Sequence, residues 1–248
     1  VSSGLALMVR YGHLPKNPAV GLSPAPGRRT NLQALTPAEY LALLPYLPEH
    51  YRPLVETHAR TGMRFGEATA LTARRVILDE DPPTIYVEEA WKRTGEYGKY
   101  VTVGPKSLKG TRNVPIDAVL TESLKPLVQG KKPEDTIFAT VEGAIVRHNN
   151  FHFRIWRPAA VKAYEERAVP FVPTIHDLRH AHATWLLTDG VPVHTVADRL
   201  GHDPAVLLRE YAHLIGQSRT VASDAIGRLL KPDGTPAKRK ARKKSSSR

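Results

Sequence analysis

The pattern of apolar and polar positions divides the chain into a helical first part, a short β-type middle and a long helical remainder. A helix start is predicted at Thr36-Pro37-Ala38-Glu39, where Thr36 can cap the helix, Pro37 suits the first turn and Glu39 can bond back to the cap. The compact part of the chain is expected to begin about here. Further helices are expected over residues 50–61 and 64–72.

The spacing then changes to the alternation that is typical of strands. Strands are expected over residues 84–90, 100–106 and 111–116, and the turn sequence Lys109-Gly110 predicts a hairpin between the last two. From residue 117 the pattern is helical again, and Gly190 and Gly201 mark helix ends. The expected later helices cover residues 117–128, 150–164, 176–188, 192–200, 204–211 and 217–230. The fold class predicted from these elements is α+β, mainly helical, with a small three-stranded antiparallel sheet.

The two ends of the chain differ in composition from this domain. Residues 5–11 have the pattern of a helix ended by Gly12, and residues 15–29 are rich in Pro and Gly without periodicity, as in a linker. The chain begins without methionine, so we expect residues 1–30 to be the end of a truncated N-terminal domain with its linker. Residues 31–230 would form the compact domain, and the Lys-, Arg- and Ser-rich residues 231–248 a disordered basic tail.

Composition adds a strong basic charge to this picture. Lysine and arginine total 36 against 24 acidic residues, a formal net charge of +12, which favours a polyanionic partner. A solvated tail that only adds non-specific DNA affinity accounts for part of the excess equally well. The absence of cysteine excludes disulfides, thiolate metal sites and a cysteine nucleophile. The apolar stretch at residues 5–9 is too short to cross a membrane, and we expect a cytoplasmic protein.

The first candidate site is the segment Thr61-Gly62-Met63-Arg64-Phe65-Gly66-Glu67-Ala68. Arg64 begins a predicted helix, where its guanidinium and the backbone amides of the helix start can hold a phosphate. Taken alone, Arg64 is more often a surface charge that pairs with Glu67 on the next turn.

The second candidate is the predicted hairpin turn, which carries the three cations Lys106, Lys109 and Arg112. A lysine on such a turn can reach into a neighbouring groove and donate a proton if its pKa falls. A turn that only adds solubility explains the same three residues, and without context it is the preferred interpretation.

The third candidate is the helix start His176-Asp177-Leu178-Arg179-His180-Ala181-His182. His176 and Arg179 are three positions apart, so both can face one site. Three histidines so close together also suggest a metal site. However, positions i and i+2 do not share a helical face, and no acidic cluster supplies oxygen ligands, so metal binding is disfavoured.

The fourth candidate is Leu200-Gly201-His202 with Tyr211 nine positions later. A single tyrosine on a helix is usually a half-buried core residue with its hydroxyl at the rim. Residues 192–202 also have the pattern of a helix-turn-helix element, which would make the protein a DNA-binding module rather than an enzyme.

Taken together and in this order, the four candidates resemble the tyrosine recombinases, or phage integrases. The matching features are Arg within T-G-x-R-x-x-E, Lys on a β-hairpin, H-x-L-R-H, L-G-H and then Tyr. The resemblance covers residues 36–230, and residues 17–19 (Asn-Pro-Ala) resemble the linker that follows the family's N-terminal core-binding domain. It implies the catalytic-domain fold of this family.

The resemblance also implies a role for each residue. Arg64 and Arg179 would clamp the non-bridging oxygens of the scissile phosphate, with His202 as a third donor. Tyr211 would attack the phosphorus and form a 3′-phosphotyrosyl bond. The remaining roles are proton acceptor from the tyrosine for His176, proton donor to the leaving 5′-oxygen for Lys106 and bracing of the pocket for Glu67. The resemblance gives no role to His180 or His182, which are expected to be structural or to contact phosphate. Apart from the resemblance, we expect DNA contacts for Lys109, Arg112 and His180.

Further expectations from the resemblance concern cofactors and partners. The reaction would need no metal and no ATP, its partner would be double-stranded DNA, and the protein would be a monomer when free and a synaptic tetramer on DNA. The helix expected over residues 217–230 would dock on a neighbouring protomer or fold back in cis. The alternatives are a catalytically silent DNA-binding protein of the same fold, a helix-turn-helix regulator and a metal phosphohydrolase.

Overall fold

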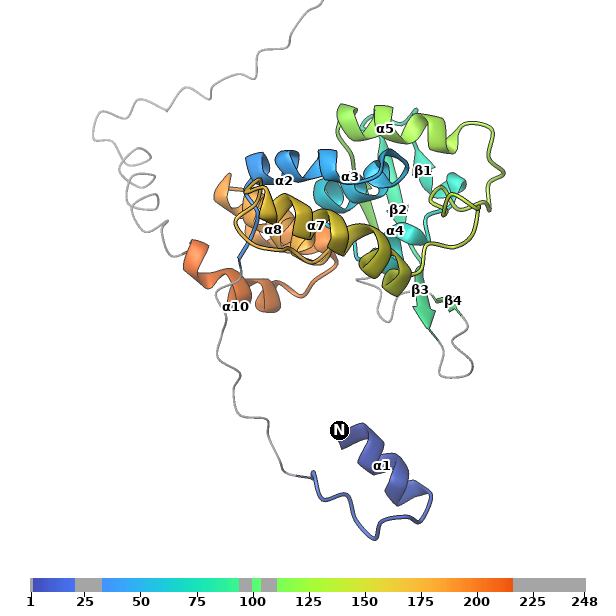
Figure 1. Cartoon of the computed structure of the whole chain (residues 1–248), viewed down its shortest axis with the longest axis vertical. Helices are drawn as coiled ribbons and strands as arrows, with labels where there is room; N and C mark the ends of the chain where they lie inside the picture. The colour runs from blue at the N-terminus through green and yellow to red at the C-terminus, as the bar shows by residue number, and fades with distance from the viewer. Residues whose placement is uncertain (1, 21–32, 94–99, 104–110, 216–248) are drawn as a thin grey trace, which may run out of the picture. The chain divides into compact units, whose positions relative to one another are not determined.

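The computed structural model describes residues 2–20, 33–93, 100–103 and 111–215, which fall into two units that meet in sequence at Ala34 (Figure 1). In the first unit, helix α1 (Ser2–Arg10) ends at Gly12, whose φ of 75° is readily adopted only by glycine. The expected helix is present and begins earlier than predicted. The predicted linker lies partly outside the described residues.

The second unit begins with the predicted capping box. The Thr36 hydroxyl accepts a hydrogen bond from the Glu39 amide at 3.2 Å, and the Glu39 carboxylate accepts one from the Thr36 amide at 2.7 Å. Helix α2 (Pro37–Leu43) therefore starts where the sequence predicts. The other helices are α3 (Arg52–Thr61), α4 (Phe65–Thr69), α5 (Ala118–Val128), α6 (His148–Phe151), α7 (Arg157–Glu165), α8 (Asp177–Thr188), α9 (Val193–Leu200) and α10 (Pro204–Ile215).

Shorter helical turns join several of these helices. A π-helical turn, His152–Trp156, connects α6 to α7, so the single helix predicted over residues 150–164 has three parts. Three-ten turns occur at Leu44–Tyr46, Glu49–Tyr51 and Ala73–Arg75.

A three-stranded antiparallel sheet is present, as predicted, in the order β1 (Val76–Ile77), β2 (Thr84–Val87) and β5 (Arg112–Pro115). The predicted hairpin between residues 100–106 and 111–116 is wrong. Strand β4 (Tyr100–Val103) pairs instead with β3 (Ala90–Arg93) in a separate two-stranded sheet, while β5 pairs with β2.

The predicted pairing is wrong because the strand expected over residues 84–90 is interrupted at Glu88 and Glu89. These two residues belong to no strand, and their carboxylates form ion pairs with Arg75. The predicted strand is thereby divided into β2 and the start of β3, and β3 provides the edge with which β4 pairs. Figure 1 shows β3 and β4 projecting from the body of the second unit.

Packing around α3 brings distant segments of the second unit together. Val55, Ala59 and Met63 are fully buried, and α3 packs against α4, α5 and α8. Helix α9 contacts α8 and β5, and α10 contacts α8 and α9. These contacts bring the C-terminal ends of α3 and α9 close to each other, as the carbonyls of Gly62 and Leu200 show by sharing the side chain of Arg179.

Several sequence predictions fall outside the described residues. They are Lys106, Lys109, the helix expected over residues 217–230 and the basic tail 231–248. Among the helices that the structure describes, none is long and apolar enough to cross a membrane.

Candidate active site

The C-terminal end of α9 is the centre of the candidate site. The last carbonyl groups of a helix have no partner within the helix and carry partial negative charge, so they attract cations. Here three consecutive carbonyls each accept a hydrogen bond from a different arginine. The pairs are Arg199 O with Arg112 Nε at 2.8 Å, Leu200 O with Arg179 Nη2 at 2.7 Å, and Gly201 O with Arg64 Nη2 at 3.5 Å.

Arg179 is buried in this site, with 3 % of its surface exposed. Its Nη1 donates to the carbonyl of Gly62 at 2.5 Å and its Nη2 to that of Leu200, which fixes the plane of the guanidinium. Burial, and then the charge of Arg64, lower the pKa of Arg179 to about 9, so it keeps its charge at neutral pH. Its Nε is buried and has no hydrogen-bond partner among the residues that the structure describes.

Arg64 lies directly before α4 and near the glycine that ends α3. Gly62 has a φ of 66°, and a Cβ at this position would overlap the side chains of Leu200 and His182. The amide N–H of Arg64 donates a hydrogen bond to the Glu67 carboxylate at 2.8 Å. The guanidinium, whose side chain is 44 % exposed, is the part of Arg64 that can reach a ligand.

Glu67 joins Arg64 to Arg112. Its Oε1 lies 2.8 Å from Arg64 Nη1, and its Oε2 lies 2.7 Å from Arg112 Nη2. A DNA contact is predicted for Arg112 from its place beside the cationic turn, but the structure buries it, and its guanidinium bonds to Glu67 and to the carbonyl of Arg199. These contacts give Arg112 a bracing position behind the exposed Arg64.

His202 follows the glycine that ends α9. Gly201 has a φ of 63°, and the His202 amide donates to the carbonyl of Ala197 at 2.9 Å. Burial, and then the charges of Arg179 and Arg64, lower the pKa of His202 to about 4, so its ring is neutral at neutral pH. Its Nδ1 is buried and finds no hydrogen-bond partner within the described ranges. His202 Nδ1 and Arg179 Nε thus have no partner in the described part of the chain, and an acceptor on a ligand would pair with them.

Tyr211 lies on α10 and packs into a small core with Ala183, Val196 and Leu207. Its side chain is more deeply buried than the half-buried position expected of a lone tyrosine, with 3 % of the residue exposed. Its φ and ψ of −111° and 16° are not helical, so α10 is kinked at this residue. The hydroxyl lies 2.8 Å from Nδ1 of His180.

Of the three histidines of α8 and its start, two contact each other and the third lies apart. The rings of His176 and His180 are in edge contact, with centroids 4.8 Å apart. His182 instead bonds through Nδ1 to the carbonyl of Ala59 and accepts a hydrogen bond at Nε2 from Arg199. In the described ranges, no group of three or more His, Cys, Asp or Glu side chains is placed to hold a metal ion.

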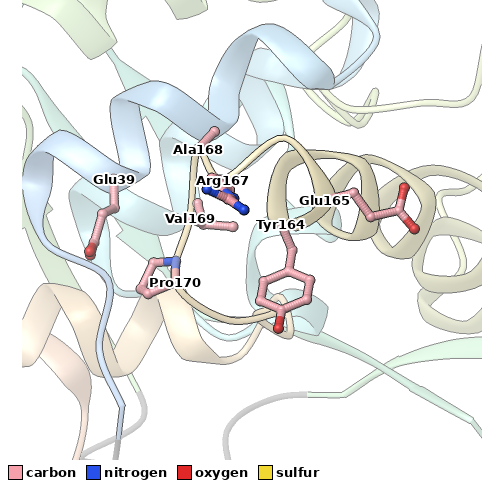
Figure 2. A pocket seen from close by; sticks show the side chains of 7 residues that line it. All are labelled: Glu39, Tyr164, Glu165, Arg167, Ala168, Val169 and Pro170. Carbon is pink, nitrogen blue, oxygen red and sulfur yellow. The ribbon is translucent and has the colours of Figure 1, made fainter.

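A separate pocket of about 540 Å³ lies beside the end of α7 (Figure 2). It contains none of the candidate site residues. Its lining residues are Glu39, Tyr164, Glu165, Arg167, Ala168, Val169 and Pro170.

Sequence reasoning does not find two of the contacts that build this site. It assigns Arg112 to DNA and not to Glu67, and it does not connect His180 with Tyr211. A pattern signal exists for His180 alone, because it lies four positions after His176 and therefore on the same helical face.

The sequence and the fold are similar to those of known proteins. Residues 33–217 match the phage integrase family. An integrase/recombinase from Escherichia coli is 27% identical over 240 residues, covering 85% of this chain and 69% of that protein. A tyrosine recombinase from Pseudothermotoga lettingae is 35% identical over 125 residues, covering 49% of this chain and 40% of that protein.

A solved structure shares the fold. The integrase of the transposon Tn1549, solved in complex with circular intermediate DNA, superposes with a TM-score of 0.69 at 19% sequence identity, covering 89% of this chain and 76% of that one. Since the family match extends over most of the chain and includes the described residues of the candidate site, this chain belongs to the phage integrase family of tyrosine-type site-specific recombinases.

Proposed function

We propose that this chain cleaves and rejoins double-stranded DNA at a specific site through a 3′-phosphotyrosyl bond to Tyr211. The observation that carries the proposal is the grouping of Arg64, Arg179 and His202 around the end of α9, where Arg179 Nε and His202 Nδ1 have no partner among the described residues. A phosphate in this place would supply the acceptors that these donors lack.

In the proposed reaction, the two guanidiniums bind the non-bridging oxygens and stabilise the extra negative charge of the pentacoordinate transition state. Arg179 is rigid because two backbone carbonyls hold it, and Arg64 is braced by Glu67. A rigid, positively charged clamp needs little reorganisation during the reaction, which is the condition for strong electrostatic catalysis.

Tyr211 is the proposed nucleophile. Its oxygen forms a bond to phosphorus while the bond from phosphorus to the 5′-oxygen breaks, so the energy of the phosphodiester is kept for rejoining. This chemistry needs neither a metal ion nor ATP. Lys106 remains the predicted proton donor to the 5′-oxygen, and Lys109 a predicted DNA contact. The family resemblance gives His176 the role of accepting the tyrosine proton.

The partners follow from charge and family. The net charge of +12 supports binding to DNA, which we expect to weaken strongly as salt concentration rises. A monomer in solution, a synaptic tetramer on DNA and a cytoplasmic location remain predictions. Residues 1–30 are proposed to be the end of a core-binding domain.

The experiment is covalent capture from a library of nicked DNA duplexes with randomised sequence. The chain is incubated with the library, denatured in detergent and extracted, and DNA that stays attached to protein is sequenced. We expect an adduct that forms in the presence of EDTA and is absent with Tyr211→Phe. The recovered sequence then defines the substrate for rate measurements.

The alternatives predict different outcomes of the same experiment. A catalytically silent DNA-binding protein of the same fold would retain DNA without any covalent adduct, and its affinity would not depend on Tyr211. A metal phosphohydrolase would cleave the DNA without forming an adduct, and EDTA would abolish the cleavage. Either result contradicts the proposed function.

A further inference from the structure

The hydroxyl of Tyr211 has a defined partner, His180. The two residues are 31 positions apart in sequence, and α8 and α10 pack together so that Nδ1 of His180 lies 2.8 Å from the phenol oxygen. The tyrosine ring is fixed by the apolar side chains around it. Since the ring cannot turn freely, this hydrogen bond determines where the hydroxyl points.

His180 also follows Arg179 directly in α8. Arg179 is anchored to the carbonyls of Gly62 and Leu200, so the backbone that carries His180 is held relative to the phosphate clamp. One turn of α8 therefore connects the proposed phosphate site with the proposed nucleophile.

A phenol in this environment needs a proton acceptor. Burial raises the pKa of Tyr211, and the charge of Glu210 raises it further, although Arg179 acts in the opposite direction. A neutral histidine with its proton on Nε2 presents Nδ1 as an acceptor, which matches the geometry of the contact.

We propose that His180 holds the Tyr211 hydroxyl before the reaction and accepts its proton during the attack. This inference rests on the proposed function. The new bond joins the Tyr211 oxygen to phosphorus, the bond from phosphorus to the 5′-oxygen breaks, and the phenol proton moves to Nδ1 of His180 to give an imidazolium. The 5′-oxygen takes its proton from the general acid of the cleavage step. The imidazolium returns its proton to the phenol oxygen when the strands rejoin.

The family resemblance assigns this role to His176, and the geometry favours His180 instead. His176 lies at the exposed start of α8 and contacts the ring of His180, whereas the hydrogen-bond partner of the Tyr211 hydroxyl in the described part of the chain is His180.

The first test needs no DNA and examines the contact itself. In the 248-residue chain with ¹⁵N-labelled histidine, Tyr211→Phe removes the hydrogen-bond donor, so we expect the Nδ1 resonance of His180 to shift. The resonances of His182, which bonds to Ala59 and Arg199, serve as the internal control and should not change. An unchanged His180 resonance would overturn the inference.

The second test measures the rate of adduct formation on the captured substrate. We expect His180→Ala to slow it by about 100-fold, the usual contribution of a proton acceptor. His180→Gln keeps a hydrogen-bond acceptor but is not basic, so it should also be slow and provides a second variant if His180→Ala does not fold. Replacing Tyr211 with difluorotyrosine, whose phenol is more acidic, should rescue both His180 variants.

A matched variant makes the rescue specific. His202→Ala removes a proposed phosphate donor rather than the base, so difluorotyrosine should not restore its rate. If His180→Ala forms adduct at the unmodified rate while Tyr211→Phe forms none, the function stands and the role of His180 is wrong. If the unmodified chain forms no adduct on any captured DNA, the proposed function fails and this inference fails with it.

Discussion

Arg112 on β5 and Glu67 on α4 form a buried ion pair, with Nη2 and Oε2 2.7 Å apart and less than a tenth of either side chain exposed. The same carboxylate also pairs with the exposed Arg64. Arg112 in turn donates to the carbonyl of Arg199 in the last turn of α9. Glu67 therefore connects an exposed guanidinium of the proposed phosphate clamp with the helix end on which the site is built.

Removing the charge of Glu67 should destabilise the fold. In Glu67→Gln the buried Arg112 loses its counter-ion, and breaking a buried pair on one side costs about 3 kcal/mol. We expect a loss of that order in the free energy of unfolding, measured by urea titration with circular dichroism. The control is Glu122→Gln, since Glu122 pairs with Lys125 on the surface and should contribute less than about 1 kcal/mol. Equal losses in the two variants would contradict the prediction.

The same pair predicts how stability depends on pH. Burial by itself would raise the pKa of Glu67, but the hydrogen bond and charge of Arg112, followed by Arg64, lower it to about 2 from the ordinary 4.5. Because the pKa in the folded state is the lower one, the stabilisation is complete above about pH 4.5 and is lost as the pH falls toward 2. The stability difference between the unmodified chain and Glu67→Gln should shrink across this window. Urea titrations at a series of pH values from about 5 to about 2 would test this. A stability difference that stays constant over this range would show that Glu67 does not titrate as proposed.

Local signals in the sequence predict local structure well. The capping box at Thr36 and Glu39 depends on residues three positions apart, and the left-handed glycine at position 201 depends on the end of a single helix. The order of the motifs also predicts Arg64, Arg179 and His202 as one site. For these residues, the chemistry is encoded in short stretches of chain.

Contacts between distant segments could not be predicted in the same way. The pairing of β5 with β2 depends on the point at which a strand ends, which the apolar pattern does not mark at Glu88. The acceptors of the arginines are backbone carbonyls, which every residue has, so no sequence pattern reveals them. For the same reason Arg112 could be recognised as a cation but not as the partner of Glu67.

Arg64 should be needed for cleavage much more than for folding. Its guanidinium is partly exposed and is proposed to bind the phosphate, so Arg64→Ala should slow adduct formation by about 100-fold or more. The matched control is Arg74→Ala, because Arg74 is exposed to a similar degree and pairs with Glu134 outside the site. Single-turnover rates on the captured substrate provide the comparison. Similar rates for the two variants would remove Arg64 from the phosphate clamp.

His202 should respond to phosphate in the absence of cleavage. Burial and the neighbouring arginines lower its pKa to about 4, and an anion bound beside it favours the protonated ring. We therefore expect the pKa of His202, followed by NMR, to rise when inorganic phosphate is added. His182 is the control: its pKa is lowered to about 3 by burial and then by Arg199, and its two nitrogens are already bonded. If the pKa of His202, like that of His182, is the same with and without phosphate, the anion does not occupy the proposed place.

Gly62 should be required by the close approach of α3 to α9. Its φ of 66° disfavours any other residue, and a Cβ would meet the buried side chain of Leu200 and lie 2.7 Å from Cδ2 of His182. Gly130 has a similar φ of 76°, and a Cβ there would have nothing within 4 Å, so Gly130→Ala isolates the backbone strain of about 1 kcal/mol. Gly62→Ala should lose clearly more stability than Gly130→Ala in urea unfolding. It should also slow adduct formation, because the Gly62 carbonyl holds Arg179. Equal losses in the free energy of unfolding for the two substitutions would mean that α3 and α9 can separate freely. The clamp would then not depend on their contact.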